Sequence, residues 1–585
     1  MFGNIIFIND TIAHIAIPSG IPVSTNLMNM HIVFEDDNKK IIGEVEDIGK
    51  DLIKVRFLGE LIENNFIGGV IRKPSLSANI RIITKEELAI LIGNSRDSIT
   101  LGVSPLYDNY PITVDINEFF SNHMAIFGNT GSGKSCGVAR VLQNVFMSKS
   151  FVPYKSNFLV FDSYGEYHNA FCDINKINPN YNFKYYTTNK NDKDGFPLEI
   201  PIWLMSIDDF ALLLGAESHS QIPIIEQMLK LVRIFASKES VATEYKNHLI
   251  ASAIMTILYT NQTSSSKRND VFSILSTCST KEFNLEAPVQ GLGYVRKFRE
   301  CFLIDSTGQF SESILLTQYV SSYIKEELDK FEVKEDLYFT LEDVEKALNF
   351  TLISEGLLRN EKSYNDAITL KVRLHSLLIG EYARFFNCKV FVDLESFIAS
   401  LVTLNGKKAQ IINFNLEDVD DAIAKVITKI FSRLLFDFTK GLKSRASIPF
   451  HIFLEEAHRY VQEDKDKYLI GYNIFERIAK EGRKYGLIFN LISQRPVEIS
   501  ETVISQCSNF LIFKMTHPRD IDYIKKMLPN MSTEIIEKQK SLQSGNCVAF
   551  GRAFKIPMII KMPMPDPAPQ SSNCDVVKNW QVNKK

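Results

Sequence analysis

Residues 123–135 read His-Met-Ala-Ile-Phe-Gly-Asn-Thr-Gly-Ser-Gly-Lys-Ser, and this stretch decides the fold. The apolar run His123–Phe127 is typical of a short buried strand, and the residues from about Cys136 onward are compatible with a helix. The glycine-rich loop between them matches the Walker A pattern, in which backbone amides and the positive end of the following helix bind phosphates. The sequence therefore predicts a site for a nucleoside triphosphate.

Each residue type in this loop has a chemical task. The glycines let backbone N–H groups approach the phosphates, Lys134 reaches the β- and γ-phosphates, and the Ser135 hydroxyl is a ligand for Mg²⁺. The expected cofactors are ATP and Mg²⁺. The expected nucleotide-binding residues are Gly128, Asn129, Thr130, Gly131, Ser132, Gly133, Lys134, Ser135 and Cys136. A glycine-rich turn without a ligand is the alternative, and the strand–loop–helix context disfavours it.

Length and composition narrow the class of protein. A chain of 585 residues is long enough for roughly two to four domains. The net charge of −3 gives no overall basic field, so contact with nucleic acid requires a local basic surface such as a pore lining. No secretion signal and no stretch of about 18 apolar residues is visible. The eight cysteines form no CxxC pair and predict reduced, mostly buried thiols, so we expect a cytoplasmic protein without membrane helices.

The chain divides into five predicted segments. Residues 1–105 contain short β-rich runs about ten residues apart, which favours a small β-barrel. Residues 106–203 alternate strand and helix, residues 204–390 show helical periodicity, and residues 391–562 return to the α/β pattern. We therefore predict an α/β core that carries the Walker A loop, interrupted by a helical insertion. Residues 563–585 open with four prolines and predict an extended tail.

Two polar stretches of the insertion are predicted to be loops. They are Thr263–Asp270, with the sequence Thr-Ser-Ser-Ser-Lys-Arg-Asn-Asp, and Leu358–Asp366. Helices are expected on either side of them, at Ile222–Ala236, Ile314–Phe331 and Leu341–Asn349.

A second chemical element follows the apolar run Phe450–Leu454, which ends in Glu455 and Glu456. An apolar strand that ends in two acids places them at the carboxyl edge of a parallel sheet, where ligands bind in open α/β folds. We expect Glu455 on the Mg²⁺ side and Glu456 as the base that orients the attacking water. Two solvated carboxylates at the start of a helix are the alternative.

A third element is the strand Gly486–Ile492, which is followed by Ser493 and Gln494. A glutamine at this strand end can lie between the γ-phosphate and a neighbouring element and sense hydrolysis. Because it follows the strand with two acids, we count Gln494 among the candidate catalytic residues.

At this point the sequence resembles the HerA branch of the HerA/FtsK hexameric ATPases. The matching stretches are His123–Ser135, Phe161–Tyr167, Ile200–Leu204, Leu454–His458, Lys480–Gly486, Ser493–Pro496 and Gly545–Pro557. Together these stretches span the chain from about residue 110 to 560. Their order and number make the resemblance specific. The β-rich N-terminus resembles the small HAS barrel of that family, which is akin to the N-terminal domain of rotary ATP synthase subunits.

The resemblance implies a RecA-like P-loop core with a helical-bundle insertion, assembled as a homohexamer that pumps double-stranded DNA through its pore. It also implies a separate effector enzyme, a nuclease or, in bacterial defence pairs, an NAD-degrading enzyme of the sirtuin-like class. Two positions depart from the pattern. Asn413 stands where the family tends to carry an aspartate, and Asn122 stands where we expect a basic residue.

Three further residues are candidates for catalysis. Glu166 is expected at the end of the strand next to the P-loop, and the corresponding region of rotary ATPases supplies the water-activating acid, so Glu166 is a rival base to Glu456. Arg483 is the favoured arginine finger, inserted across a subunit boundary, and Arg552 is the second choice. A surface or DNA-facing role is the alternative for both arginines.

Several other functions remain as alternatives. Asp162–Gly165 and Asn189–Asp192 fit the DxxG and NKxD patterns of a GTPase switch. However, too few residues separate the two patterns for a G domain, and the second pattern lies in a very polar stretch that is typical of a loop. A conjugative coupling ATPase commonly has membrane helices, which are not predicted here. A scaffold ring that uses ATP to assemble its partner needs the same site as a motor.

Composition bears on the biological setting. Asn-rich stretches such as Asn178–Asn182, together with the cysteines, are atypical of hyperthermophiles, which favours bacterial antiviral defence over an archaeal DNA-end-resection motor. DNA contact is expected to be electrostatic and on the inside of the ring. The candidate basic residues for it are Lys484, Arg495, Lys514, Arg519, Lys525 and Lys526.

Overall fold

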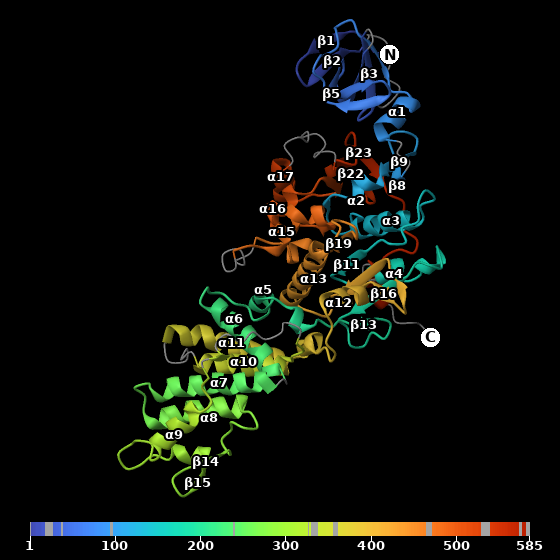
Figure 1. Ribbon diagram of the computed structural model, residues 1–585. Coiled ribbons are helices and arrows are strands. Elements are labelled where there is room, and N and C mark those ends of the chain that lie inside the picture. The colour runs from blue at the N-terminus through green and yellow to red at the C-terminus, as the bar shows by residue number, and fades with distance from the viewer. Residues whose placement is uncertain are drawn as a thin grey trace.

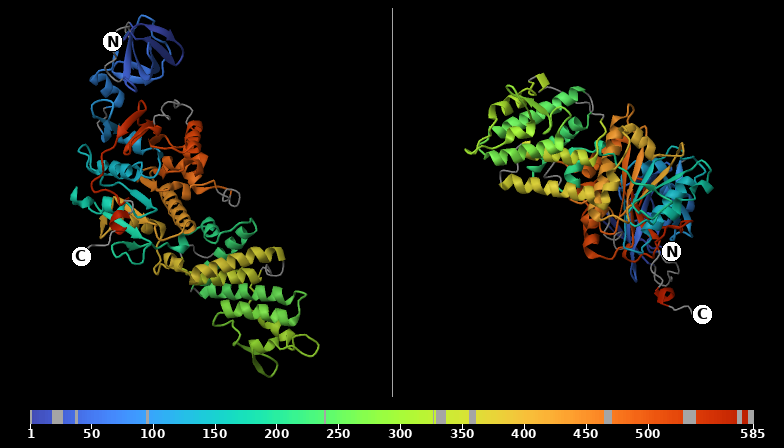
Figure 2. Two further views of the ribbon diagram at one scale, coloured as in Figure 1. Left: turned by 180° about the vertical axis from the view of Figure 1, so that it is seen from behind. Right: turned by 90° about the horizontal axis from the view of Figure 1, so that it is seen from below.

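In the computed structural model the chain forms three regions along one long axis (Figure 1). A small antiparallel sheet lies at one end, a large sheet with helices on its faces lies in the middle, and a helical lobe forms the other end (Figure 2). The structure describes residues 2–17, 27–36, 39–93, 97–237, 240–325, 327–328, 337–354, 361–463, 471–527, 539–571 and 576–580.

The central sheet has twelve strands in the order β13-β12-β18-β11-β19-β20-β10-β21-β22-β23-β8-β9. From β13 to β21 the neighbouring strands are parallel, and from β22 to β9 they are antiparallel. The parallel strands are β13 (Phe196–Pro197), β12 (Phe183–Thr187), β18 (Ile411–Asn415), β11 (Phe158–Asp162), β19 (Phe450–Leu454), β20 (Leu487–Ser493), β10 (Met124–Phe127) and β21 (Asn509–Phe513). The antiparallel ones are β22 (Asn546–Gly551), β23 (Met558–Lys561), β8 (Ser98–Ser104) and β9 (Tyr110–Asp115).

Both faces of the parallel part of the sheet are covered by helices. Along β10, Met124 and Ile126 belong to the apolar cluster that contains α3 (Lys134–Phe146), whereas Ala125 and Phe127 belong to the cluster that contains α13 (Asp421–Gly441). A strand buried on both faces reads as a continuous apolar run, which is why β10 and β19 could be found from their sequences. The predicted α/β core is confirmed.

The N-terminal region is a curled seven-stranded antiparallel sheet with its own apolar core. Its strands are β1 (Ile5–Ile8), β2 (Ile12–Ala16), β3 (His31–Asp36), β4 (Lys39–Ile48), β5 (Leu52–Ile62), β6 (Asn65–Gly68) and β7 (Asn79–Ile82). Helix α1 (Lys85–Ile92) connects it to β8, which pairs with β9 and β23 of the central sheet. Residues 98–104, which the prediction placed in the N-terminal segment, thus form a strand of the central sheet in the structure.

The helical lobe lies between β13 and β18 in the sequence. Its helices are α5 (Ile207–Leu213), α6 (Gln221–Ala236), α7 (Ser240–Leu258), α8 (Ser264–Cys278), α9 (Ser313–Ser321), α10 (Leu341–Ser354) and α11 (Glu361–Ile379). Helix α12 (Leu394–Leu401) returns the chain to the core, where it packs on α13. Helix α9 ends at Ser321, earlier than predicted, and residues 326 and 329–331 of the expected helix lie outside the described residues.

Both predicted polar loops of the lobe prove to be helical in large part. Residues 264–270 form the first two turns of α8, because the Thr263 hydroxyl accepts a hydrogen bond from Ser266 N and caps the helix. The run of serines after Thr263 was mistaken for a loop, although a threonine cap is a helix signal. Residues 358–360 lie outside the described part of the chain, and α11 begins at Glu361.

The C-terminal residues are only partly the extended tail that was predicted. Residues 563–571 contain no helix or strand, but they lie against the core, and a short helix α19 (Val576–Trp580) follows. Within the described residues, no helix is long and apolar enough to cross a membrane. The seven cysteines of the described part are all free, and Cys301, Cys507 and Cys547 are buried.

Candidate functional site: a phosphate-binding loop facing buried acids

The glycine-rich loop joins β10 to α3, which begins at Lys134. Gly131 and Gly133 have φ angles of 72° and 104°, a region that residues with side chains rarely adopt. The Lys134 ammonium lies over the loop and donates to the carbonyl oxygen of Asn129 at 3.0 Å. The strand, loop and helix N-terminus that phosphate binding requires are therefore all in place.

A second segment supports the loop from behind. The Ser544 hydroxyl donates to Gly131 O at 2.9 Å, and Gly545 N donates to Ser132 O at 3.0 Å. A Cβ atom on Gly133 would lie 3.0 Å from Gly545 N, so this close approach also requires a glycine. The turn before β22 thus fixes the shape of the phosphate-binding loop.

Glu455 follows the last residue of β19 and is buried opposite the loop. The Ser135 hydroxyl donates to Glu455 Oε1 at 3.4 Å. Burial raises the pKa of the Glu455 carboxyl well above its ordinary value, and the neighbouring acids Asp162 and Glu166 raise it further. A cation placed between Ser135 and Glu455 would relieve this concentration of buried negative charge.

Glu456 points away from Glu455 because its backbone is left-handed, with a φ of 48°. This conformation is uncommon for a residue with a side chain and costs on the order of 1–3 kcal/mol. Glu456 is buried as well, and burial raises the pKa of its carboxyl, while nearby Lys134 lowers it. The two adjacent glutamates therefore face different partners.

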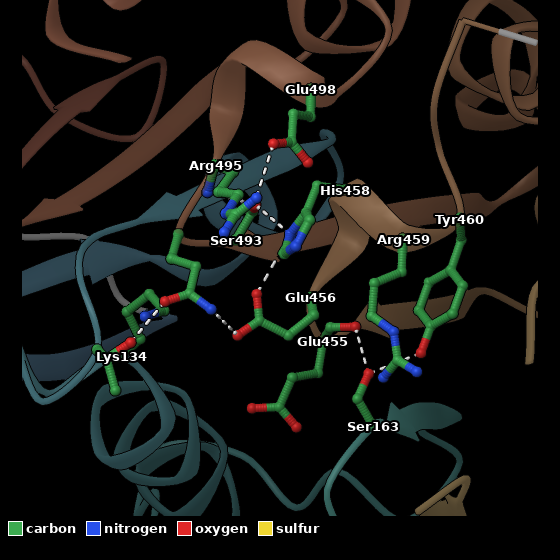
Figure 3. Close-up of polar contacts among 12 residues, drawn as sticks. Lys134, Ser163, Glu455, Glu456, His458, Arg459, Tyr460, Ser493, Arg495 and Glu498 are labelled. Carbon is green, nitrogen blue, oxygen red and sulfur yellow. Dashed lines mark hydrogen bonds and ion pairs between the residues drawn. The ribbon is translucent and has the colours of Figure 1, made fainter. Parts of the chain in front are cut away.

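A chain of polar contacts links the loop to Glu456 (Figure 3). The Thr130 hydroxyl donates to Gln494 Oε1 at 2.5 Å, and Gln494 Nε2 donates to Glu456 Oε1 at 3.0 Å. On the other side, Glu456 Oε2 lies 3.3 Å from His458 Nδ1, which lies 3.0 Å from the Ser493 hydroxyl. The end of β20 thus places Gln494 between the phosphate-binding loop and the candidate base.

Glu166 lies in the turn that follows β11. The carboxylate of Asp162 shapes this turn by accepting hydrogen bonds from Glu166 N at 3.0 Å and Tyr167 N at 2.9 Å. Burial raises the pKa of Glu166, and a hydrogen bond with Ser135 lowers it. Glu166 therefore faces the same serine as Glu455, whereas Glu456 faces Gln494.

The strand that carries Glu166 is not next to the P-loop strand, contrary to the prediction. The order is β11-β19-β20-β10, so two strands separate them. Glu166 still reaches the site because the turn after β11 extends beyond the carboxyl edge of the sheet. The adjacent strands of β10 are β20 and β21.

The candidate arginine fingers lie at the opposite edge of the sheet. Arg483 precedes β20 and donates from Nη1 to Asn122 Oδ1 at 3.0 Å, just before β10 begins. Arg552 follows β22 and donates from Nε to Glu118 Oε2 at 2.6 Å. Both arginines thus contact the segment that starts at α2 (Ile116–Phe120), far from the loop of their own chain.

The two departures from the family pattern both have local consequences. Asn413 on β18 donates from Nδ2 to Asp162 Oδ2 at 3.2 Å, so an aspartate here would place two carboxylates in contact. Asn122 accepts from Arg483, so a basic residue here would face a guanidinium. In both cases the amide avoids a repulsion between like charges.

Several residues of the site were not predicted as functional. His458 contacts Glu456, and the hydroxyls of Ser163 and Tyr460 lie 2.6 Å apart, with Ser163 also donating to Glu455 O at 2.9 Å. The sequence held a signal for His458, since it closes the Leu-Glu-Glu-Ala-His run. It held none for Ser163, because nothing in its neighbourhood shows that it meets β19 (Figure 3).

The predicted basic residues do not share one surface. Lys514 directly follows β21, and Arg495 lies two residues after the end of β20, both at the carboxyl edge. Arg519 and the Lys525–Lys526 pair lie on α17 (Pro518–Met527). Lys484, in contrast, is exposed beside Arg483 at the amino edge. Arg495 is paired with Glu498 at 3.0 Å.

The loop and the acids line one cleft of about 540 Å³, which also includes Tyr164, Gln494 and residues of the C-terminal segment. The described residues include no group of three His, Cys, Asp or Glu side chains that could hold a metal ion by themselves. Mg²⁺ in phosphate-binding sites takes one or two protein oxygens and completes its shell with phosphates and water. Ser135 and Glu455 fit that requirement, and the unpartnered buried Oε2 of Glu455 is consistent with it.

Comparisons with known proteins show what this chain is similar to. Residues 99–284 match the family described as "Helicase HerA, central domain". The DNA double-strand break repair helicase HerA of Pyrococcus furiosus is 22% identical over 92% of this chain and 82% of its own length. HerA of Saccharolobus solfataricus is 30% identical, but the match spans 28% of this chain and only 33% of that protein. Among solved structures, VirB4 of Thermoanaerobacter pseudethanolicus aligns with 12% identity over 80% of this chain and 97% of its own, with a TM-score of 0.45.

Proposed function

Because this chain belongs to the HerA-type ATPases of the HerA/FtsK superfamily, we propose that it hydrolyses ATP and uses the energy to move double-stranded DNA. The observation that carries the proposal is the cleft in which a phosphate-binding loop faces two buried glutamates with different partners. The names of its relatives, which are described as helicases, support the DNA substrate.

The residues of the cleft divide the work of hydrolysis. Lys134 neutralises charge on the β- and γ-phosphates, and Ser135 with Glu455 would hold Mg²⁺, which supplies charge stabilisation at the transferred phosphoryl group. Glu456 accepts the proton of the attacking water, since it lies beside Gln494 and reaches toward the loop. Glu166 is the rival for this task, and its hydrogen bond with Ser135 favours a place beside the metal instead.

The position of Arg483 supports a ring. An arginine at the sheet edge opposite its own loop can complete a site only on a neighbouring subunit. We therefore propose a homohexamer in which each interface joins one loop to the Arg483 of the next chain, with Arg552 as the alternative finger. The central region then corresponds to a RecA-like core, the curled sheet to the family's small barrel, and the lobe to its helical insertion.

A ring with six copies multiplies every inward-facing basic residue. A few lysines and arginines per subunit are then enough for a positive pore in a protein with a net charge of −3. Arg495 and Lys514 are the preferred candidates, because they lie just after strands that end at the same edge as the ATP site. Movement of the catalytic glutamine would then be passed directly to a DNA contact.

The biological setting is a further part of the proposal. The composition favours bacterial antiviral defence with an effector enzyme, either a nuclease or an NAD-degrading enzyme, and an end-resection motor is the second choice. A scaffold ring that holds the effector without moving DNA uses the same residues. The GTPase switch has less support, since Asn189–Asp192 lies in the loop that follows β12 and does not line the cleft.

One experiment separates motor from scaffold. The purified protein, with a partner captured from the native host, would be followed on single tethered DNA molecules with ATP. A motor shortens or displaces the DNA at a rate that depends on ATP, and the Lys134→Ala protein does not. ATP hydrolysis without any movement, with and without the partner, would favour the scaffold.

A further inference from the structure

The segment Met562–Ser571 is held against the nucleotide-binding core rather than extended into solvent. Gln143 of α3 accepts from Asp566 N at 3.0 Å and donates to Pro567 O at 2.8 Å. Asn169 Nδ2 donates to Ala568 O at 2.9 Å. Because the buried amide of Gln143 both donates to this segment and accepts from it, the segment has a fixed path along α3.

The same segment also contacts two elements that line the catalytic cleft, the turn that carries Glu166 and the first turn of α3. Gln570 N donates to the carbonyl oxygen of Glu166 at 2.8 Å. Burial raises the pKa of the thiol of Cys136, one residue after Ser135, and the side chain of Ser571, which lies near that thiol, lowers its pKa. Met562 packs so closely on α3 that a Cβ on Gly137 would lie 3.1 Å from its sulfur. The segment therefore faces the first turn of α3 and the turn that carries Glu166.

The direction of a bound nucleotide follows from the loop. Lys134 reaches the β- and γ-phosphates, and the backbone that follows it lies beside the α-phosphate. A nucleoside is attached to the α-phosphate, so it must extend past Cys136. The residues that line the cleft there come from the C-terminal segment: Met562, Pro563, Met564, Gln570 and Ser571.

The chemistry of these side chains suits a purine nucleoside. Met562, Pro563 and Met564 form an apolar surface, and a methionine sulfur packs favourably against an aromatic ring. Met564 is 68% exposed, so its side chain is accessible to a base bound in the cleft. The exposed amide of Gln570 offers one acceptor and two donors to the edge of a base.

We propose that Met562–Ser571 is the nucleoside-binding wall of the site, with Met564 stacking on the base and Gln570 bonding to its edge. This inference rests on the proposed function, since it assumes that ATP binds at the loop. It assigns recognition of the base to a proline-rich segment more than 400 residues away from the Walker A lysine in sequence. It also places Glu166 in contact with the wall through a main-chain hydrogen bond.

The test compares two probes that share the phosphates and differ in the nucleoside. Binding of ATP and of inorganic tripolyphosphate would be measured by calorimetry for the wild type and for Met564→Ala/Gln570→Ala. Both side chains are exposed, so the double variant should fold normally. Gln290→Ala, an exposed glutamine of the helical lobe, is the matched control.

If Met562–Ser571 binds the nucleoside, the double variant should bind ATP at least 10-fold more weakly than the wild type does. Its affinity for tripolyphosphate should equal that of the wild type. Unchanged ATP affinity, or an equal loss for both probes, would overturn the inference while leaving the ATP site itself intact. If the wild type and Lys134→Ala bind ATP equally, or if neither binds it, the proposed function fails instead.

Discussion

Gln494 donates a hydrogen bond from Nε2 to Glu456 Oε1 at 3.0 Å, while its Oε1 accepts from the Thr130 hydroxyl at 2.5 Å. One amide thus joins the candidate base to the phosphate-binding loop. Any group that binds in the loop and displaces Thr130 must also affect the position of Glu456. This contact offers a physical route from the state of the γ-phosphate to the end of β20.

Replacing Gln494 should therefore impair turnover more than binding. We expect Gln494→Ala to lower kcat by about 10- to 100-fold, a typical loss for a misplaced catalytic group, with little change in ATP affinity. Steady-state ATPase assays and calorimetry would check this. Gln462→Ala, which removes an amide that donates to His458 O, is the control. A Gln494→Ala protein with wild-type kcat would show that the bridge has no catalytic role.

Glu456→Gln should bind ATP and hydrolyse it very slowly. The substitution keeps the shape of the side chain but removes the proton acceptor, which typically costs about 10²- to 10⁴-fold. Glu166→Gln, measured in parallel, should retain more activity than Glu456→Gln. The reverse order, with near-normal turnover in Glu456→Gln, would identify Glu166 as the base.

Subunit sharing predicts complementation between two inactive variants. Lys134→Ala lacks a working loop but keeps its arginine, and Arg483→Ala lacks the arginine but keeps its loop. Mixed rings should regain part of the ATPase activity at interfaces where the intact halves meet. The mixing experiment is repeated with Arg552→Ala to test the second candidate finger. With mixed rings verified by native mass spectrometry, no recovery at any ratio would exclude Arg483 from a role across subunits.

Two buried histidines predict that acid destabilises the core. Burial lowers the pKa of His123 and of His451 to about 4, below the value of about 6.5 for an exposed histidine. The unfolded chain binds protons first as the pH falls. As the pH falls from about 6.5 to 4, each histidine therefore lowers the free energy of unfolding by up to about 1.4 kcal/mol per pH unit. Above about pH 6.5 this loss is absent, because both states are then neutral at the histidine.

The measurement is the difference in Tm between about pH 7.5 and pH 5.5. His451→Leu should reduce this difference, because His451 lies among the rings of Phe120 and Phe158 and an apolar side chain suits the site. His219→Leu, on the surface, is the control. If His451→Leu shows the wild-type difference, protonation of His451 does not contribute to acid sensitivity.

Local sequence predicted the parts of the site that are contiguous in the chain. The Walker A loop and the pair Glu455–Glu456 could be found because a buried strand and its terminal residues leave a clear pattern. The order of the strands in the sheet could not be predicted from the sequence in the same way. Nothing in the sequence of β20 states that it inserts between β19 and β10, so the distance of Glu166 from the P-loop strand was misjudged.

The other errors have a common physical cause. The composition of Ser264–Asp270 and of Pro563–Ser571 is typical of loops, but individual hydrogen bonds decide their structure. A threonine cap converts the first into helix, and Gln143 and Glu166 hold the second against α3 and the adjoining turn. Composition reports the intrinsic preference of a segment, and a local cap, as at Thr263, or a long-range hydrogen bond, as at Gln143, can override that preference.

The central claim is that ATP hydrolysis in this cleft is coupled to double-stranded DNA. The most direct test is the ATPase rate in the presence of DNA duplexes of increasing length, at constant total base pairs and at several salt concentrations. We predict stimulation that grows with duplex length, does not depend on sequence, weakens steeply with salt and is absent in Glu456→Gln. An ATPase activity that requires Lys134 but is unaffected by DNA of any length, even with the cognate partner present, would contradict the account.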